Sequence, residues 1–257
     1  MKHLEVIREA NGKQPVELVP TFLGAHTVPP EFKSKRREYV RLLVERLLPA
    51  VAERKLAVFC DVFIERIAFS YSEGKGIFSA GKKLGLLPKL HCDQLTNTNG
   101  GKLASEVGAV SADHLEHLSL AGVKALKKTG TVAVLLPSAG FYLRAKRIPP
   151  IKKLLAARVP VALATDFNPG TSPNYSLAFT MTLACVEWGF SAAQALLAVT
   201  RNAAYVLGKG GQLGLLSAGK QADFVIWEAE DYRELSYFCG VHLAKSVVKR
   251  GKVVWQK

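Results

Sequence analysis

The sequence predicts an α/β protein in which helices cover a parallel sheet. Six apolar runs of strand length alternate with segments of helical periodicity. Runs that are apolar throughout are typical of parallel strands buried on both faces. Several runs end in a histidine or a carboxylate, and the carboxyl ends of the strands of a (β/α)8 barrel all open on one face. We therefore expect a barrel of this type with functional residues at that face.

The expected strands lie, in chain order, at residues 16–25, 56–65, 86–93, 112–115, 131–137 and 161–166. The expected helices lie at 39–54, 101–107, 120–129, 151–158, 175–188 and 192–207, with Ser191 as the N-cap of the last. Because six strands are too few to close an eight-stranded barrel, we expect the barrel to be incomplete.

The texture of the sequence changes after residue 207. Residues 208–211 are typical of a flexible joint, and 213–227 and 246–255 are typical of short antiparallel strands with glycine turns. We expect a partial barrel over residues 1–207 and a small β-rich segment over residues 208–257.

The composition is that of a folded chain without a membrane span. At 257 residues, 49% hydrophobic and 22% charged, the chain can bury a full core. The longest apolar runs are interrupted by charged residues or proline before they could cross a bilayer. The four cysteines are scattered without a C-x-x-C pair, and the first residues are not typical of a signal peptide. We expect reduced thiols and a cytoplasmic location.

The formal net charge of +14 raises the question of nucleic-acid binding. The basic residues are dispersed, and neither zinc-finger spacing nor an RNA-binding string of glycines and aromatics accompanies them. We therefore do not expect a nucleic-acid partner. Binding of an anionic small molecule would account for this charge equally well, and Arg144 is a candidate to pair with such a molecule. A solvated helix face is the alternative for Arg144.

Two of the expected strands end in groups that can bind a transition metal. His91 lies near the end of the third strand, and Asp166 ends the sixth. Imidazole and carboxylate suit zinc or iron(II), and catalytic zinc usually has three protein ligands and a water. Either residue alone has an ordinary explanation, a structural histidine or a turn-forming aspartate. Their shared position at strand ends predicts one half of a metal site.

Other polar residues near strand ends could act on a substrate. His114 could transfer protons or hold a carbonyl, or it could be a surface histidine at a helix start with Asp113 as the N-cap. Gln94 could orient a substrate, but an amide is neither a general acid nor a general base. His26 follows the first apolar run, directly before a proline-rich stop.

The segments that carry these residues are Thr-Phe-Leu-Gly-Ala-His26, Lys89-Leu-His91-Cys-Asp-Gln94, Ser111-Ala-Asp-His114-Leu-Glu and Ala-Thr-Asp166-Phe-Asn168-Pro-Gly170-Thr171. Together they resemble the imidazolonepropionase family of metal-dependent amidohydrolases. The resemblance covers nearly the whole chain, and Thr200-Arg-Asn-Ala-Ala and Gly219-Lys-Gln-Ala-Asp-Phe match the general amidohydrolase ending.

The resemblance implies a TIM-like (β/α)8 amidohydrolase barrel, here from about its third to its eighth strand, followed by part of a composite β-sandwich. It implies hydrolysis of the ring amide of 4-imidazolone-5-propanoate to N-formimino-L-glutamate by metal-activated water, with one zinc or iron(II) per site. His91 and Asp166 would be metal ligands. Asp166 would also be the general base, because Gln94 stands where some relatives carry glutamate. His114 would polarise the carbonyl or shuttle protons.

The resemblance also implies the residues that contact the small molecules. His26 and Gln94 would contact the imidazolone substrate, and Thr171 would contact it as well. Asn168 and Gly170 would contact the formimino-glutamate product.

One element of the family pattern is missing from this sequence. Family members carry a His-x-His metal pair at the end of the first barrel strand, whereas the histidines here are at positions 3, 26, 91, 114, 117 and 242. We interpret the chain as the C-terminal portion of such an enzyme, with little or no hydrolase activity alone. Its expected partners are a small-molecule substrate and a second copy of the chain or a complementing N-terminal part. The alternatives are another cyclic-amide hydrolase or deaminase of the superfamily, and a non-catalytic fragment.

Overall fold

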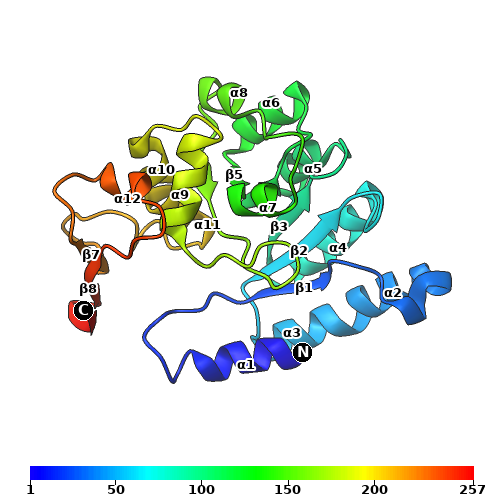
Figure 1. Ribbon diagram of the computed structural model, residues 1–257. Helices are drawn as coiled ribbons and strands as arrows, with labels where there is room; N and C mark the ends of the chain where they lie inside the picture. The colour runs from blue at the N-terminus through cyan, green and yellow to red at the C-terminus, as the bar shows by residue number, and fades with distance from the viewer. The chain divides into compact units, whose positions relative to one another are not determined.

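The computed structural model describes residues 1–257, and its central element is a six-stranded sheet in the order β1-β2-β3-β4-β5-β6 (Figure 1). Strands that follow one another in the chain are therefore neighbours in the sheet, with helices in the connections. This arrangement confirms the predicted α/β class and all six predicted strands. The strands are β1 Thr21–Ala25, β2 Phe59–Ile64, β3 Leu87–Cys92, β4 Ser111–His114, β5 Val132–Leu135 and β6 Val161–Leu163.

The first four strands are parallel, and their register decides which side chains share a face. Asp61 of β2 is paired with Lys89 of β3, and His91 of β3 is paired with Asp113 of β4. Because alternate residues of a strand point to the same face, these four polar residues belong to one face. The opposite face is buried and apolar, with Val62 as an example, except at the end of β4, where His114 is paired with Cys92. The sheet thus has one polar face in a chain whose strands are otherwise apolar.

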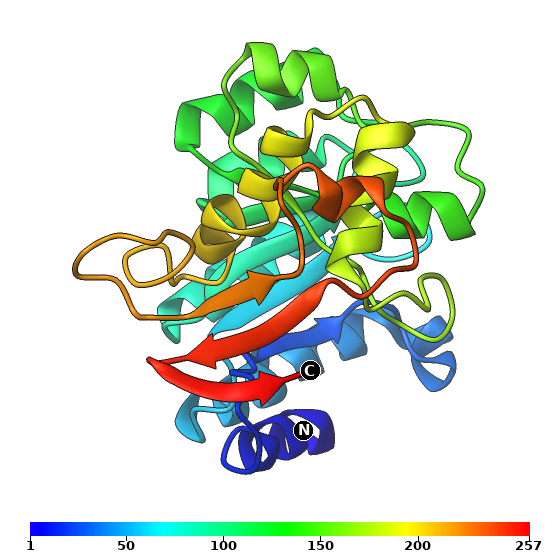
Figure 2. The same cartoon turned by 60° about the vertical axis from the view of Figure 1, so that its left-hand side comes forward.

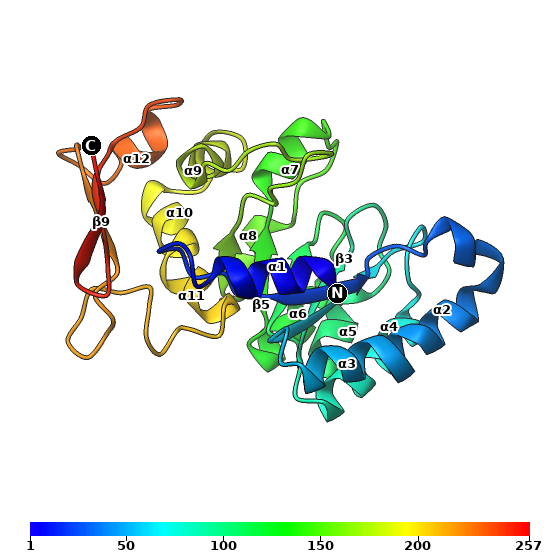
Figure 3. The same cartoon turned by 90° about the horizontal axis from the view of Figure 1, so that it is seen from below.

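Chain segments far apart in sequence form two compact units, one made of residues 1–133 and 152–159 and the other of residues 134–151 and 160–257. In the first unit, α2, η2 and α3 follow one another as one helical rod (Figure 3), with a π-helical turn in the middle. Pro49 lacks a backbone N–H, so this turn rearranges where an α-helical hydrogen bond is missing. The helical segments of the first unit are α1 Lys2–Ala10, η1 Pro30–Lys35, α2 Arg36–Leu42, η2 Leu43–Leu47, α3 Leu48–Glu53, α4 Tyr71–Lys83, α5 Gly100–Val107 and α6 Leu120–Thr129.

Helix α4 is absent from the sequence prediction, because three glycines lower its helical propensity. One of these glycines is required by packing. A Cβ on Gly74 would lie 2.3 Å from Ile64 Cδ1 of β2, whereas one on Gly81 would make an ordinary contact 3.5 Å from Cys60 Cβ. A capping box at Ser70 starts the helix and compensates for part of the lost propensity. Contact with the sheet, rather than local helix propensity, therefore determines that this segment is helical.

The second unit contains β6, several helices and a separate antiparallel sheet in the order β7-β8-β9. Figure 2 shows this sheet in orange and red, and it confirms the predicted β-rich ending. The predicted single helix over 192–207 is wrong, because Thr200 interrupts it with φ −116° and ψ −91°. The elements are α7 Pro137–Tyr142, α9 Leu177–Val186, α10 Ala192–Val199, α11 Arg201–Val206, β7 Phe224–Trp227, α12 Glu234–Tyr237, β8 Ala244–Lys249 and β9 Lys252–Gln256, while α8 Ile151–Ala156 lies across the division between the units.

All four cysteines are free thiols. Burial raises the pKa of the Cys60 thiol to about 12, so this cysteine is a poor nucleophile. No helix combines the length and the apolar character needed to cross a membrane.

Replacement of Gly101 by alanine tests the close approach of α5 and α6. The new Cβ would lie 2.5 Å from Leu118 Cδ1 and 3.0 Å from Gly122 Cα, so G101A is expected to lower the free energy of unfolding by about 1–3 kcal/mol. Chemical denaturation followed by circular dichroism measures this change. The matched control is G76A in α4, where a Cβ meets nothing within 4 Å and is expected to add about 0.5–1 kcal/mol. Equal effects of the two substitutions would contradict the packing argument.

Candidate metal centre

The polar face of β2, β3 and β4 gathers groups that can bind a metal ion. Asp61, His91 and Asp113 each offer a ligand atom, and these atoms all lie within 4.8 Å of one another. The side chain of Asp61 is 4% exposed and that of His91 is 16% exposed. His91 and Asp113 lie in the carboxyl-terminal halves of β3 and β4, and Asp61 lies near the middle of β2. The structure therefore builds a compact imidazole and carboxylate cluster inside the first unit.

His91 is held in this cluster by a hydrogen bond and by neighbouring rings. Its Nδ1 lies 2.9 Å from Asp61 Oδ1. The His26 ring, which follows β1, meets the His91 ring edge-on at a centroid distance of 5.5 Å and stacks on Phe63 at 5.2 Å. The structure thus brings His26 and His91 together, as expected for polar residues near the carboxyl ends of parallel strands, although β2 lies between β1 and β3.

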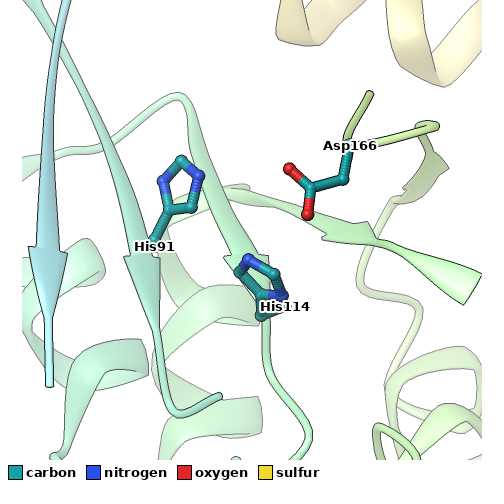
Figure 4. A group of neighbouring side chains, drawn as sticks. All are labelled: His91, His114 and Asp166. Atoms are coloured by element: carbon teal, nitrogen blue, oxygen red, sulfur yellow. The ribbon is translucent and has the colours of Figure 1, made fainter. Parts of the chain in front are cut away.

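His114 ends β4 and joins the same cluster. Its ring centroid lies 5.4 Å from that of His91 (Figure 4), and the residue is 3% exposed. The alternative of a surface histidine at a helix start is therefore wrong, and Asp113 is a strand residue rather than an N-cap. His114 and Leu115 have φ values of 80° and 74°, a strained left-handed conformation that turns the chain sharply at the strand end.

Buried atoms of this cluster lack hydrogen-bond partners. His114 Nδ1 and Asp113 Oδ1 are buried without one, although Glu116 Oε1 lies 3.8 Å from His114 Nδ1. Leaving such groups unsatisfied costs about 1–3 kcal/mol each, which a bound ligand would relieve. Imidazole and carboxylate are also the donors that zinc and iron(II) accept. The residues present fit a transition metal on both counts.

The charges around the cluster are buried and interdependent. Lys89 Nζ lies 4.2 Å from the centre of the Phe59 ring. Burial lowers the pKa of Lys89, while the charges of Asp113 and Asp61 oppose that shift. Burial likewise raises the pKa of Asp113, and the neighbouring Asp61 adds to the effect. The sequence analysis missed Asp61, Lys89 and Asp113 as members of the centre. Polar residues recurring with a period of two inside apolar strands were the available signal.

Two buried carboxylates fix the loop that carries Gln94. Glu65, 2% exposed at the end of β2, accepts hydrogen bonds from the backbone N–H groups of Leu95 at 2.9 Å and Thr96 at 3.0 Å. It also accepts a hydrogen bond from the Thr96 hydroxyl. Gln94 is half-buried beside them.

Asp93 completes the anchoring of this loop. It is fully buried and accepts hydrogen bonds from the N–H groups of Thr98 at 2.8 Å, Gly100 at 3.1 Å and Gly101 at 3.1 Å. These donors include the first N–H groups of α5, which have no partner within the helix. Glu65 is one of the polar strand-end residues expected at the functional face, whereas the sequence predicts no role for Asp93.

The remaining candidates lie in the loop after β6 in the second unit. Asp166 begins this loop with φ 51° (Figure 4). Asn168 Nδ2 donates to Asp166 O at 2.8 Å and to Thr171 Oγ1 at 2.9 Å. Its Oδ1 accepts from the N–H groups of Gly170 at 2.9 Å and Thr171 at 2.7 Å. Asn168 therefore organises the loop and supports the left-handed backbone of Asp166.

Arg144 does not lie on a helix face. It lies in an exposed turn after α7 with φ 51°. Together with Arg147 and Trp188 it lines a hollow of about 300 Å³ in the second unit.

Imidazole and carboxylate groups cluster on a parallel α/β sheet, and the chain belongs to the amidohydrolase family. Residues 92–255 match the model described as the amidohydrolase family. This match covers more than half of the chain and includes His114 and Asp166.

Curated relatives of the chain include imidazolonepropionases. The chain is 45% identical over 254 residues to the imidazolonepropionase of Geobacillus kaustophilus (strain HTA426). The alignment covers 99% of the chain and 60% of that protein. It is 46% identical over 256 residues to the imidazolonepropionase of Shewanella baltica (strain OS185), which covers 100% of the chain and 63% of that protein. The chain thus spans about 60% of the length of the relatives that it matches.

Solved structures confirm the fold. An adenosine deaminase from Xanthomonas campestris with bound zinc aligns with a TM-score of 0.74 at 19% identity, covering 97% of this chain and 63% of that one. A variant of atrazine chlorohydrolase from Arthrobacter aurescens TC1, complexed with zinc and atraton, aligns with a TM-score of 0.76 at 15% identity, covering 100% and 65%. At these identities the likeness supports the fold alone.

Substitution of Glu65 by glutamine tests the anchoring of the Gln94 loop. Burial alone would raise the pKa of Glu65, but the hydrogen bonds that it accepts, led by that of Thr96, outweigh burial and lower the pKa. The contribution of Glu65 to stability is therefore full above the ordinary glutamate pKa and is lost as the pH falls through the lowered value. E65Q is expected to cost about 1–3 kcal/mol near pH 7 and less near pH 3, measured by urea denaturation.

The matched control for this prediction is E9Q on α1. The side chain of Glu9 is 67% exposed, so the same loss of charge is expected to leave stability nearly unchanged at both pH values. A destabilisation by E65Q of the same size at both pH values would show that the carboxylate charge is not what holds the loop.

Proposed function

We propose that this chain carries part of the active site of an imidazolonepropionase. The reaction is hydrolysis of the ring amide of 4-imidazolone-5-propanoate to N-formimino-L-glutamate. The observation that carries the proposal is the match of 99% of the chain to curated imidazolonepropionases, combined with the strand-end cluster around His91 and His114. Neither alone is sufficient, because a family match does not fix chemistry and a histidine cluster does not fix a substrate.

We propose that His91 and Asp166 hold one zinc or iron(II) ion. His91 lies near the carboxyl end of β3 and Asp166 follows β6 of the same sheet, and the carboxyl ends of parallel strands meet at one edge. Catalytic zinc usually takes three protein ligands, so further ligands would come from the part of the relatives that this chain does not match. When bound, the metal supplies a polarised water near neutral pH.

The protein's own groups then position the substrate and move protons. Asp166 would accept a proton from the attacking water, and His114 would polarise the ring carbonyl or return a proton to the leaving nitrogen. The buried, partnerless His114 Nδ1 supports this role, because a substrate atom would satisfy it. Gln94 and His26 would contact the imidazolone ring from loops on either side of His91.

The loop after β6 would bind the other end of the small molecules. We propose that Asn168 and Gly170 contact the product and that Thr171 contacts the substrate. Hydrogen bonds within the loop already engage the amide of Asn168, which supports a preformed binding surface rather than one that folds around the ligand.

The proposed assembly includes the rest of the enzyme. A polypeptide supplying the unmatched part of the relatives would complete it in the cytoplasm, and the complete enzyme would form a homodimer. The partial barrel would extend over residues 1–207 and the β-rich segment over residues 208–257.

The purified chain alone is expected to hydrolyse 4-imidazolone-5-propanoate slowly or not at all, because two ligands hold a catalytic metal poorly. Co-expression with the unmatched segment of the Geobacillus kaustophilus relative is expected to restore turnover, followed spectrophotometrically as the ring opens. Fast turnover by the chain alone would refute the need for a complementing part. Preference for another cyclic amide or an aminated ring over imidazolonepropanoate would favour the alternative hydrolase or deaminase.

Removal of one proposed ligand tests the metal assignment. H91A and D166A are each expected to lower zinc content and turnover of the complemented enzyme by at least tenfold, measured by metal analysis and rate. The matched control is H3Q, which removes an exposed imidazole on α1 and is expected to change neither. Full zinc content in H91A would exclude His91 as a ligand.

A further inference from the structure

We propose that Asp61 is a positioning residue that fixes the tautomer and orientation of His91, so that Nε2 faces the metal. Nothing in the sequence or in the family comparison assigns a role to Asp61. The inference rests on the proposed function for the identity of the metal ligand, but the hydrogen bond itself belongs to the metal-free chain and can be tested there.

The geometry of the pair supports a donated Nδ1 proton. Asp61 Oδ1 lies 2.9 Å from His91 Nδ1, a good hydrogen-bond distance. An ionised carboxylate offers acceptors only, so the shared proton belongs to Nδ1. A neutral imidazole with its proton on Nδ1 has its lone pair on Nε2, which is the form that binds a metal. The contact therefore selects one of the two tautomers.

The environment of the Asp61–His91 pair favours this tautomer of His91. The Asp61 side chain is 4% exposed, so water competes weakly for its oxygens. Both residues lie in regular β2 and β3, where the ladder fixes the spacing of their backbones. The His26 and His114 rings lie beside the His91 ring, at centroid distances of 5.5 Å and 5.4 Å. Rotation of His91 about its side-chain bonds would break the hydrogen bond and displace these rings.

Asp113 provides an internal comparison. It lies on the same face, is paired with His91 in the register of β3 and β4, and belongs to the same group of ligand atoms. Its Oδ1, however, is buried without a hydrogen-bond partner. Loss of Asp113 would remove a carboxylate from the same pocket while leaving the Asp61–His91 hydrogen bond in place. The two aspartates therefore separate the effect of the bond from the effect of nearby charge.

The first measurement is the tautomer of His91 in the metal-free chain. Long-range ¹H–¹⁵N spectra of histidine-labelled protein at about pH 8, where most imidazoles are neutral, report which nitrogen carries the proton. The His91 signals are assigned by their loss in H91Q. We expect the Nδ1–H form in the wild-type chain and in D113N, and a mixture of tautomers in D61A. An Nε2–H form in the wild-type chain would overturn the proposal without the need for any variant.

The second measurement is zinc affinity by chelator competition, using zinc alone with the complemented enzyme. D61A is expected to bind zinc about 10–100-fold more weakly, and D61N to recover part of the loss because its amide oxygen still accepts from Nδ1. Equal losses in D61A and D113N would show that charge, rather than the hydrogen bond, is responsible. If D61A fails to fold, D61N and the wild-type tautomer still decide the question. Absence of zinc binding with an intact Nδ1–H tautomer would count against the proposed function alone.

Discussion

The parallel register of β2, β3 and β4 is the constraint on which the rest of the centre depends. The ladder hydrogen bonds pair Asp61 with Lys89 and His91 with Asp113, and alternation then places all four on one face. A slip of one residue in a single strand would send its polar residues into the apolar face. The cluster is thus a consequence of the pairing of the strand backbones.

A polar face inside an α/β protein is costly unless its groups are satisfied, and the chain satisfies most of them internally. Asp61 is bonded to His91, Glu65 to the loop after β3, and Asp93 to the start of α5. The atoms left without partners in this region include His114 Nδ1 and Asp113 Oδ1. Unsatisfied atoms concentrated beside ligand-type side chains are what a site for a metal and a polar substrate requires before either is bound.

Packing explains where local sequence preference failed. Helix α4 contains glycines that argue against a helix, yet Gly74 lets it approach β2 more closely than a side chain would allow. The predicted helix over 192–207 divides at Thr200, whose hydroxyl donates to Leu196 O, and Asn202 Nδ2 then binds Val161 O of β6 at 2.7 Å. In both places a contact between distant segments determines the backbone conformation. The periodicity of the local sequence does not reveal such a contact.

The sequence by itself determined the α/β class, the six strands and the strand-end positions of His91 and Asp166, because apolar runs and their polar endings are local patterns. It also showed the family resemblance, because the motifs that carry it are continuous stretches of sequence. Only the tertiary structure decided that His114 is buried, that Asp61 and Lys89 belong to the centre, and which nitrogen of His91 meets a carboxylate. Those properties depend on register between strands about 25–30 residues apart, which no local pattern encodes.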